Sequence, residues 1–245
     1  MKKKSGSPPA EQKPETAPPV NSAAAKNANL LPRVAADPLG NATTLWLIRH
    51  AEVEERYHNV FGGRIDMELS RRGHQQALAV ARYLEGKPLD AIYASPMKRV
   101  HQTLAPLLGN GTPIPVIIPE LREVDFGDWT GLHWTEVKAR YGVSALDWLE
   151  QLECAGIPNA ECGKTLRTRL EPCLRQILAK HSGGQIALAC HGGVIRMCLS
   201  ILFDWPLPKL AAFEIDYASL TQVLWNPPRA RLQLVNFTPW SHSTQ

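Results

Sequence analysis

The sequence predicts an α/β fold, a three-layer α/β/α sandwich in which helices cover both faces of a mostly parallel central sheet. From residue 41 onward, short apolar runs of strand length alternate with amphipathic helical patterns, the order that such a sheet requires. These roughly 200 residues are enough to bury about 70% of their unfolded-chain surface in one core. Two of the apolar runs also end in a histidine, at His50 and His191.

The first elements are read from strand-length runs and helix start signals. Residues 44–48 are a buried-strand pattern, and a helix follows with Ser70 as its N-cap. Residues 91–94 form a second strand, and a second helix begins near Pro96, because proline favours the first turn of a helix. The faces expected to be buried are Ala77, Leu78, Ala81 and Leu84 in the first helix, which Gly86 ends, and Val100, Leu104, Leu107 and Leu108 in the second.

The later elements continue the alternation. Residues 116–118 are predicted as a third strand and residues 165–180 as an amphipathic helix. A strand at 186–190 follows, and the segments 219–225 and 231–236 read as a final pair of strands separated by a proline-containing turn. The folded domain is therefore expected to span residues 41–238.

Residues 1–40 are predicted to be a disordered, basic, Pro/Ala-rich tail. They hold seven of the 20 prolines and six basic against three acidic residues, so they carry +3 of the formal net charge of +4. Such a composition buries too little apolar surface to offset chain entropy. The segment is too polar for a secretory signal. An electrostatic tether to membrane or nucleic acid is one reading, and a solubilising extension is the simpler one. Residues 239–245 are expected to be a short C-terminal tail.

The cysteine pattern and the hydropathy indicate in which cellular compartment the protein is expected. The five cysteines are odd in number and lack CxxC spacing, which favours reduced thiols in the cytoplasm. Cys190 and Cys198 lie in apolar runs and are expected in the core. No stretch approaches ~18 consecutive apolar residues, so no integral membrane segment is expected.

Nitrogen donors are expected to gather at one rim of the sheet. Arg49 and His50 follow the first strand, His191 follows the strand at 186–190, and Arg99 falls in the first turn of the second helix. The carboxyl ends of parallel strands share a rim, where α/β proteins bind ligands. Arginine forks match phosphate oxygens, and a helix N-terminus adds backbone N–H groups. Gly192 and Gly193 follow His191 and leave backbone exposed near the rim before the next helix. This pattern indicates a phosphate site.

Five segments resemble, in order, the motifs of one known family, the histidine phosphatase superfamily (branch 1), also called phosphoglycerate-mutase-like. They read LIRHAE at 47–52, FGGRIDMELSRRGHQQA at 61–77, ASPMKRVHQT at 94–103, LREVDFGDWTG at 121–131 and CHGGVIR at 190–196. Together they cover about residues 43–236. The resemblance implies the phosphoglycerate-mutase-like version of the α/β/α fold.

The resemblance also implies roles. His50 would be the nucleophile and form a phosphohistidine, which agrees with the availability of neutral imidazole at physiological pH. Arg49, Arg99 and His191 would bind the oxygens of the transferring group, and His191 would belong to the catalytic set. Glu123 would protonate the leaving alkoxide and then activate water. Asp125 and Asp128 are nearby rivals, and Glu123 could instead pair with Arg122 or Arg99.

Some positions depart from the family pattern or bear on substrate. Ala51 replaces a glycine, which requires that the backbone there avoid positive φ. Arg56 stands where several mutase-type relatives have Asn and is expected at the substrate rim, together with Gly63 and Gly192. Trp129, Trp134 and Trp148 form either an apolar substrate wall or core packing. The remaining histidines, His58, His74, His101, His133, His181 and His242, are expected to be solvated polar residues.

The predicted function is hydrolysis of a phosphomonoester of a small metabolite. A mutase is the alternative, but residues 134–163 hold one arginine, Arg140, among five acids, so a second acidic group on the substrate finds little positive charge. A non-catalytic phospholigand-binding module is the other alternative. No P-loop, HExxH, metal cluster or GxSxG is present, so no cofactor and no metal are expected. The expected partner is a small phosphorylated substrate, not nucleic acid, and the oligomeric state is left open.

Overall fold

The computed structural model describes residue 1, residues 41–109 and residues 111–241. The strands are β1 (Thr43–Arg49), β2 (Ala91–Ala94), β3 (Val116–Ile117), β4 (Gln185–Cys190), β5 (Leu220–Asn226) and β6 (Arg229–Phe237). Within this part of the chain they form a six-stranded sheet in the order β3-β2-β4-β1-β5-β6. Pairing is antiparallel only on the two sides of β5, so the sheet is mostly parallel, as predicted.

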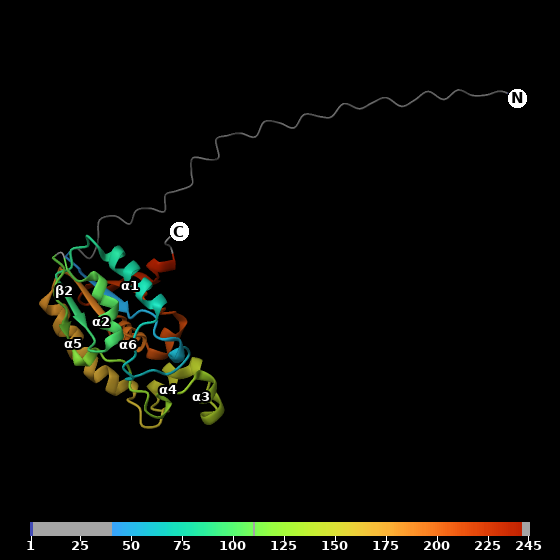
Figure 1. Cartoon of the computed structure of the whole chain (residues 1–245). Helices are drawn as coiled ribbons and strands as arrows, with labels where there is room; N and C mark the ends of the chain where they lie inside the picture. The colour runs from blue at the N-terminus through green and yellow to red at the C-terminus, as the bar shows by residue number, and fades with distance from the viewer. Residues whose placement is uncertain (2–40, 110, 242–245) are drawn as a thin grey trace. The chain divides into compact units, whose positions relative to one another are not determined.

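The helices surround the sheet (Figure 1). They are α1 (Arg71–Leu84), α2 (Lys98–Leu104), α3 (Trp134–Tyr141), α4 (Trp148–Glu153), α5 (Gly163–Lys180) and α6 (Gly192–Phe203). Short 3-10 turns join them: η1 (Glu55–Tyr57), η2 (Ala105–Leu107), η3 (Pro119–Leu121), η4 (Gly127–Trp129), η5 (Ala145–Asp147), η6 (Leu207–Ala212) and η7 (Pro239–Ser241).

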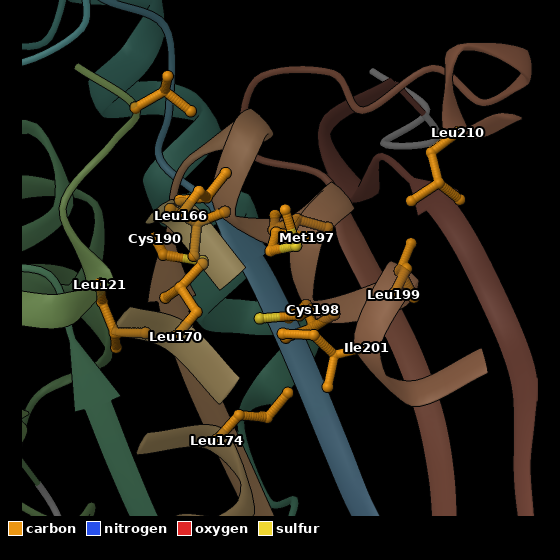
Figure 2. Close-up of a cluster of buried hydrophobic side chains, with 14 of the residues drawn as sticks. Leu121, Leu166, Leu170, Leu174, Cys190, Met197, Cys198, Leu199, Ile201 and Leu210 are labelled. Atoms are coloured by element: carbon orange, nitrogen blue, oxygen red, sulfur yellow. The ribbon is translucent and has the colours of Figure 1, made fainter. Parts of the chain in front are cut away.

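Alternation along the central strands explains the three layers. In β1, Leu45 and Leu47 pack with the side chains of α5 and α6, whereas Trp46 and Ile48 pack with those of α1 and α2. Successive strand side chains point to opposite faces, so a fully apolar strand needs helices on both sides. Figure 2 shows Leu166, Leu170 and Leu174 of α5 in the first of these clusters, together with Met197 and Cys198 of α6. Burying one such leucine stabilises the fold by about 2 kcal/mol.

Two expected core positions lie at the surface. Leu78 is 47% exposed, because α1 buries Ala77, Val80, Ala81 and Leu84 and Leu78 faces away from that stripe. Leu108 is 44% exposed, since α2 ends at Leu104. Pro106 follows within η2 and has no N–H with which to continue the α-helical ladder. The prediction that the apolar stripe of the second helix continues to Leu108 was therefore wrong.

The predicted N-terminal tail lies outside the described residues, whereas part of the predicted C-terminal tail is described. The predicted tail at 1–40 lies outside the described residues, apart from Met1, as do residues 242–245. The described fold continues past the expected domain end at 238, because Trp240 in η7 donates a 2.9 Å hydrogen bond from Nε1 to the carbonyl of Tyr217. Cys190 and Cys198 are buried, as expected. No helix in the described residues is long and apolar enough to cross a membrane.

Candidate active site

His50 stands immediately after β1, with its backbone tied on both sides. Its N–H donates to the carbonyl of Cys190 at 3.0 Å, and its carbonyl accepts from Ala218 at 3.0 Å. The ring Nδ1 lies 2.8 Å from the carbonyl of Ala51. A carbonyl can only accept, so Nδ1 carries the proton and Nε2 keeps its lone pair. Burial and the positive charges of Arg99 and Arg49 lower the pKa of His50 well below its ordinary value, which keeps the ring neutral.

His191 follows β4 on the neighbouring strand. Residues Arg49 and Cys190 are register partners, so the two histidines leave the sheet side by side, with ring centroids 5.2 Å apart. The His191 Nε2 lies 2.8 Å from Oγ of Ser95, the residue after β2. Its Nδ1 is buried without a partner among the described residues. Burial, followed by the charge of Arg99, lowers the pKa of His191 well below its ordinary value.

Arg99 supplies a buried cation from the first turn of α2. Its Nη1 donates to the carbonyl of Ile65 at 2.7 Å and its Nη2 to the carbonyl of Gly63 at 2.9 Å. Burial lowers the pKa of Arg99 to about 10, so the side chain still carries its charge at neutral pH. Gly63 has φ +47, and a Cβ there would lie 3.1 Å from the carbonyl oxygen of Val124. A glycine is therefore needed where the chain turns under Arg99.

Arg49 is held by a loop that the sequence motifs did not indicate. Its Nη1 donates to the carbonyl of Ile215, and its guanidinium carbon lies 4.1 Å from the ring centroid of Tyr217. The same Tyr217 ring lies 5.5 Å from the ring of His50. The Nε of Arg49 is buried without a hydrogen-bond partner in the described structure. Tyr217 thus orients Arg49 through a cation–π contact.

Glu123 reaches the same place from the loop after η3. Its Oε1 accepts from the N–H of Val124 at 2.9 Å, and its Oε2 accepts from the N–H of Gly193 at 3.3 Å. Gly193 lies in the first turn of α6, whose N-cap is His191. Glu123 forms no ion pair with Arg122 or Arg99 in the described residues. The carboxylate is therefore not held by a structural cation, and Glu123 lines the same cavity as His50.

The two rival acids are occupied elsewhere. Asp125 pairs with Arg64 at 3.2 Å, and Asp128 accepts from Asn159 at 2.9 Å. Neither lines the cavity into which His50 and Glu123 open.

The nucleophile candidate, the acid candidate and the two arginines open into one cavity of about 490 Å³. The predicted site residues in its wall are Arg49, His50, Gly63, Arg99, Glu123 and Gly192. Neither Arg49 nor Arg99 is ion-paired with a carboxylate among the described residues, so their charge is available to an anion. His191 is fully buried, packs against the ring of His50 and is not among the residues that line the cavity.

Arg56, expected at the substrate rim, is not part of this wall. It lies in η1, its side chain is 67% exposed, and it pairs with Glu54 at 3.0 Å. The turn directs the guanidinium to solvent, where a neighbouring carboxylate already neutralises it. Ala51 does adopt a backbone that avoids positive φ, so its methyl group is tolerated.

The tryptophans and histidines divide between core and cavity. Trp129 is fully buried in the core, whereas Trp134 and Trp148 line the cavity. His58 also lines the cavity, contrary to expectation, and its Nε2 lies 2.9 Å from the carbonyl of Val53. His133 caps α3 and His181 hydrogen-bonds Tyr93, and both are partly exposed. His242 lies outside the described residues.

Arg196 is a further cavity residue to which the motifs assigned no role. Its Nη2 donates to the carbonyl of Phe213 at 2.9 Å, and its Nη1 donates to the carbonyl of Gly192 at 3.4 Å. Burial lowers its pKa to about 10.

In the described part of the chain no group of three or more His, Cys, Asp or Glu side chains is placed to hold a metal ion.

The model of one family, the histidine phosphatase superfamily (branch 1), matches residues 45–238. The chain belongs to this superfamily. The fold and the reaction class that the motifs predicted, a phosphoglycerate-mutase-like phosphatase, are thereby confirmed.

Relatives within the histidine phosphatase superfamily cover most of the chain. Phosphoserine phosphatase 1 of Hydrogenobacter thermophilus is 28% identical over 79% of this chain and 92% of its own length. The metal-independent phosphoserine phosphatase of Arabidopsis thaliana is 31% identical over 75% of this chain and 79% of its own. The crystal structure of the alpha-ribazole phosphatase from Shigella flexneri superposes with a TM-score of 0.68 at 26% identity, covering 79% of this chain and 96% of that one.

Proposed function

We propose that this chain hydrolyses a phosphomonoester of a small metabolite, with His50 as the nucleophile. The observation that carries the proposal is the 2.8 Å contact between Nδ1 of His50 and the carbonyl of Ala51. It leaves the lone pair of Nε2 directed away from that carbonyl, in a ring that lines the arginine-rich cavity.

The phosphoryl group is expected to bind between Arg49, Arg99 and His191. Two guanidiniums without carboxylate partners offer N–H donors, and the N-terminus of α6 at Gly192 adds backbone N–H groups. These donors are held by the surrounding carbonyls before substrate arrives, so little reorganisation is needed as charge develops on the transferring oxygens.

In the first step a bond forms between Nε2 of His50 and phosphorus while the ester P–O bond breaks. Glu123, in its protonated form, gives its proton to the departing alkoxide, and the alcohol leaves. In the second step Glu123 takes a proton from water as the water oxygen attacks phosphorus. The P–N bond breaks, inorganic phosphate is released, and His50 returns to its neutral state.

Mutase chemistry is the second candidate and is less well supported. A mutase must hold a second acidic group on its substrate, but Arg140 on α3 is exposed and pairs with Glu136 at 3.0 Å. Turnover of 3-phosphoglycerate with 2,3-bisphosphoglycerate, followed by measuring 2-phosphoglycerate against released phosphate, separates the two. Dominant isomerisation would contradict the hydrolytic proposal.

Hydrolysis of p-nitrophenyl phosphate in EDTA tests the proposal. The wild type is expected to turn over, and His50→Ala to lose at least ~10³-fold in kcat, because the covalent path is removed. Equal rates for the two proteins would exclude His50 as the nucleophile. A wild-type protein that binds phosphate but never turns over would instead identify a phospholigand-binding module.

We further propose that the protein acts in a reducing compartment, the cytoplasm. All five cysteines are free thiols in the structure, and Cys190 and Cys198 are buried in the core. Cell fractionation with thiol titration of the native protein tests this. Recovery from an oxidising compartment would contradict it.

A further inference from the structure

One side of the active-site cavity is apolar and open to solvent. Trp134, at the start of α3, is 42% exposed, and Leu146, in η5, is 73% exposed. Both line the cavity, and Trp148 and Leu149 of α4 lie in the same wall. Large apolar side chains exposed around a binding site commonly mark a ligand surface.

Backbone hydrogen bonds position the residues that carry these exposed side chains. The N–H of Trp134 donates to the carbonyl of Asn59 at 2.9 Å, and His133 caps α3 by accepting from the N–H of Thr135 at 3.2 Å. The N–H of Leu146 is held by Oγ of Ser144 at 3.2 Å. The apolar wall is therefore anchored to the segment that leads to Phe61, which also borders the cavity.

The size of the cavity exceeds what a phosphoryl group requires. About 490 Å³ falls in the range that proteins use for whole small-molecule ligands. The cationic end, with Arg49 and Arg99, accounts for the phosphate. The apolar wall is the part of the cavity that is left to bind the alcohol esterified to the phosphate.

The charges nearest this wall do not favour an acidic leaving group. The guanidinium of Arg196 lies 5.8 Å from the ring centroid of Trp148 and already donates to the carbonyls of Phe213 and Gly192. Exposed Glu214 and Asp216 also line the cavity. Both acids act electrostatically on Arg196 and offset its positive charge, so a carboxylate on the substrate would gain little there, whereas a neutral ring would meet tryptophan and leucine.

We propose that the leaving group is a neutral alcohol that carries a planar apolar ring, and that Trp134 and Leu146 bind this ring. The proposal rests on the proposed phosphatase function. It makes the two side chains specificity determinants and separates the substrate from a small amino-acid phosphate such as phosphoserine, which has a carboxylate and no ring.

Substrate pairs with similar leaving-group acidity test it directly. For the wild type, kcat/KM with 2-phenylethyl phosphate is expected to exceed that with ethyl phosphate by at least ~10-fold, because the ring adds buried apolar area. O-phosphoserine is expected to be poorer than 2-phenylethyl phosphate as well. Equal kcat/KM for the first pair, or a preference for O-phosphoserine, would overturn the proposal.

Two variants and a matched control locate the effect. Trp134→Ala and Leu146→Ala are each expected to lower the ratio of kcat/KM between 2-phenylethyl and ethyl phosphate by ~3-fold or more. Leu78 lies on α1 outside the cavity and is 47% exposed, a fraction close to that of Trp134, so Leu78→Ala should leave the ratio as in the wild type. An unchanged ratio in both cavity variants would contradict the assigned wall.

A binding measurement separates failure of this inference from failure of the proposed function. 2-Phenylethylphosphonate and ethylphosphonate are not hydrolysed, so their affinities can be compared by calorimetry whether or not the protein is a phosphatase. Tighter binding of the phenyl compound, lost in Trp134→Ala, supports the inference. Equal affinities overturn it even if p-nitrophenyl phosphate is turned over.

Discussion

The backbone N–H of Gly193 lies 3.3 Å from Oε2 of Glu123 and joins the loop after η3 to the first turn of α6. Residues 70 apart in the chain thus place the proposed acid beside the second histidine. A Cβ at position 193 would lie 2.6 Å from Oε1 of Glu123 and 2.6 Å from Cγ2 of Val124. Glycine is required here because of this close approach and not because of an unusual φ.

Gly193→Ala is expected to displace the Glu123 carboxylate and lower kcat by ~10- to 100-fold. The loss in kcat/KM, which reports only the steps up to departure of the alcohol, should be larger with ethyl phosphate than with p-nitrophenyl phosphate, whose leaving group needs no proton. Steady-state kinetics with both substrates measures this, and circular dichroism checks the fold. Equal losses on the two substrates would show that the glycine acts on something other than the acid.

Glu123→Gln removes the proton donor while preserving its size. With an alkyl phosphate, kcat is expected to fall by ~10²- to 10⁴-fold, the usual contribution of a general acid. Asp128→Asn is the matched control, since Asp128 is outside the cavity and bonds Asn159. If Asp128→Asn proved the more damaging change, the assignment of the acid would be wrong.

Arg99→Lys keeps a positive charge but loses the two-pronged contact with the carbonyls of Ile65 and Gly63. We expect kcat/KM to fall by ~10²-fold, because a lysine cannot match the fork geometry at a buried site. Arg56→Lys, at the exposed arginine paired with Glu54, should match the wild type within about twofold. A large effect of Arg56→Lys would restore the substrate contact that the structure does not support.

The pH dependence follows from the lowered pKa of His50 and His191. A ring whose pKa is lowered stays neutral as the pH falls below 6.5, its ordinary value, so the acid limb of kcat/KM should lie below 6.5. Unfolded histidines bind protons there while the folded ones do not, so the free energy of unfolding should also fall as the pH drops from 6.5. Rate and thermal-unfolding profiles measure both; an acid limb above 6.5 would contradict the assigned environment.

The central site was predictable because its signals are local. His50 and His191 each follow an apolar strand directly, and Arg99 follows a strand within one helical turn, so parallel topology alone brings them together. Glu123 needed the family resemblance, since its contact with Gly193 spans the fold. The cavity positions of Trp134 and Trp148 remained undecided because a tryptophan pattern does not distinguish a core from a wall.

The supporting residues could not be read from spacing. Tyr217 acts by packing on Arg49 from a loop far along the chain, and Ser95 acts through a hydrogen bond to His191. Arg56 shows the opposite case, a plausible motif position that a 3-10 turn directs to solvent. Tertiary packing determines such contacts, and no local pattern records them.

Chemical trapping of the intermediate tests the central claim most directly. Glu123→Gln is mixed with p-nitrophenyl phosphate, whose leaving group needs no acid while water attack still needs a base, so a phosphoenzyme should accumulate. Rapid quenching and peptide mass spectrometry are expected to find an acid-labile, alkali-stable phosphoryl group on His50, which is absent in His50→Ala. Turnover without a phosphoenzyme, or a phosphoryl group on another side chain, would contradict the account.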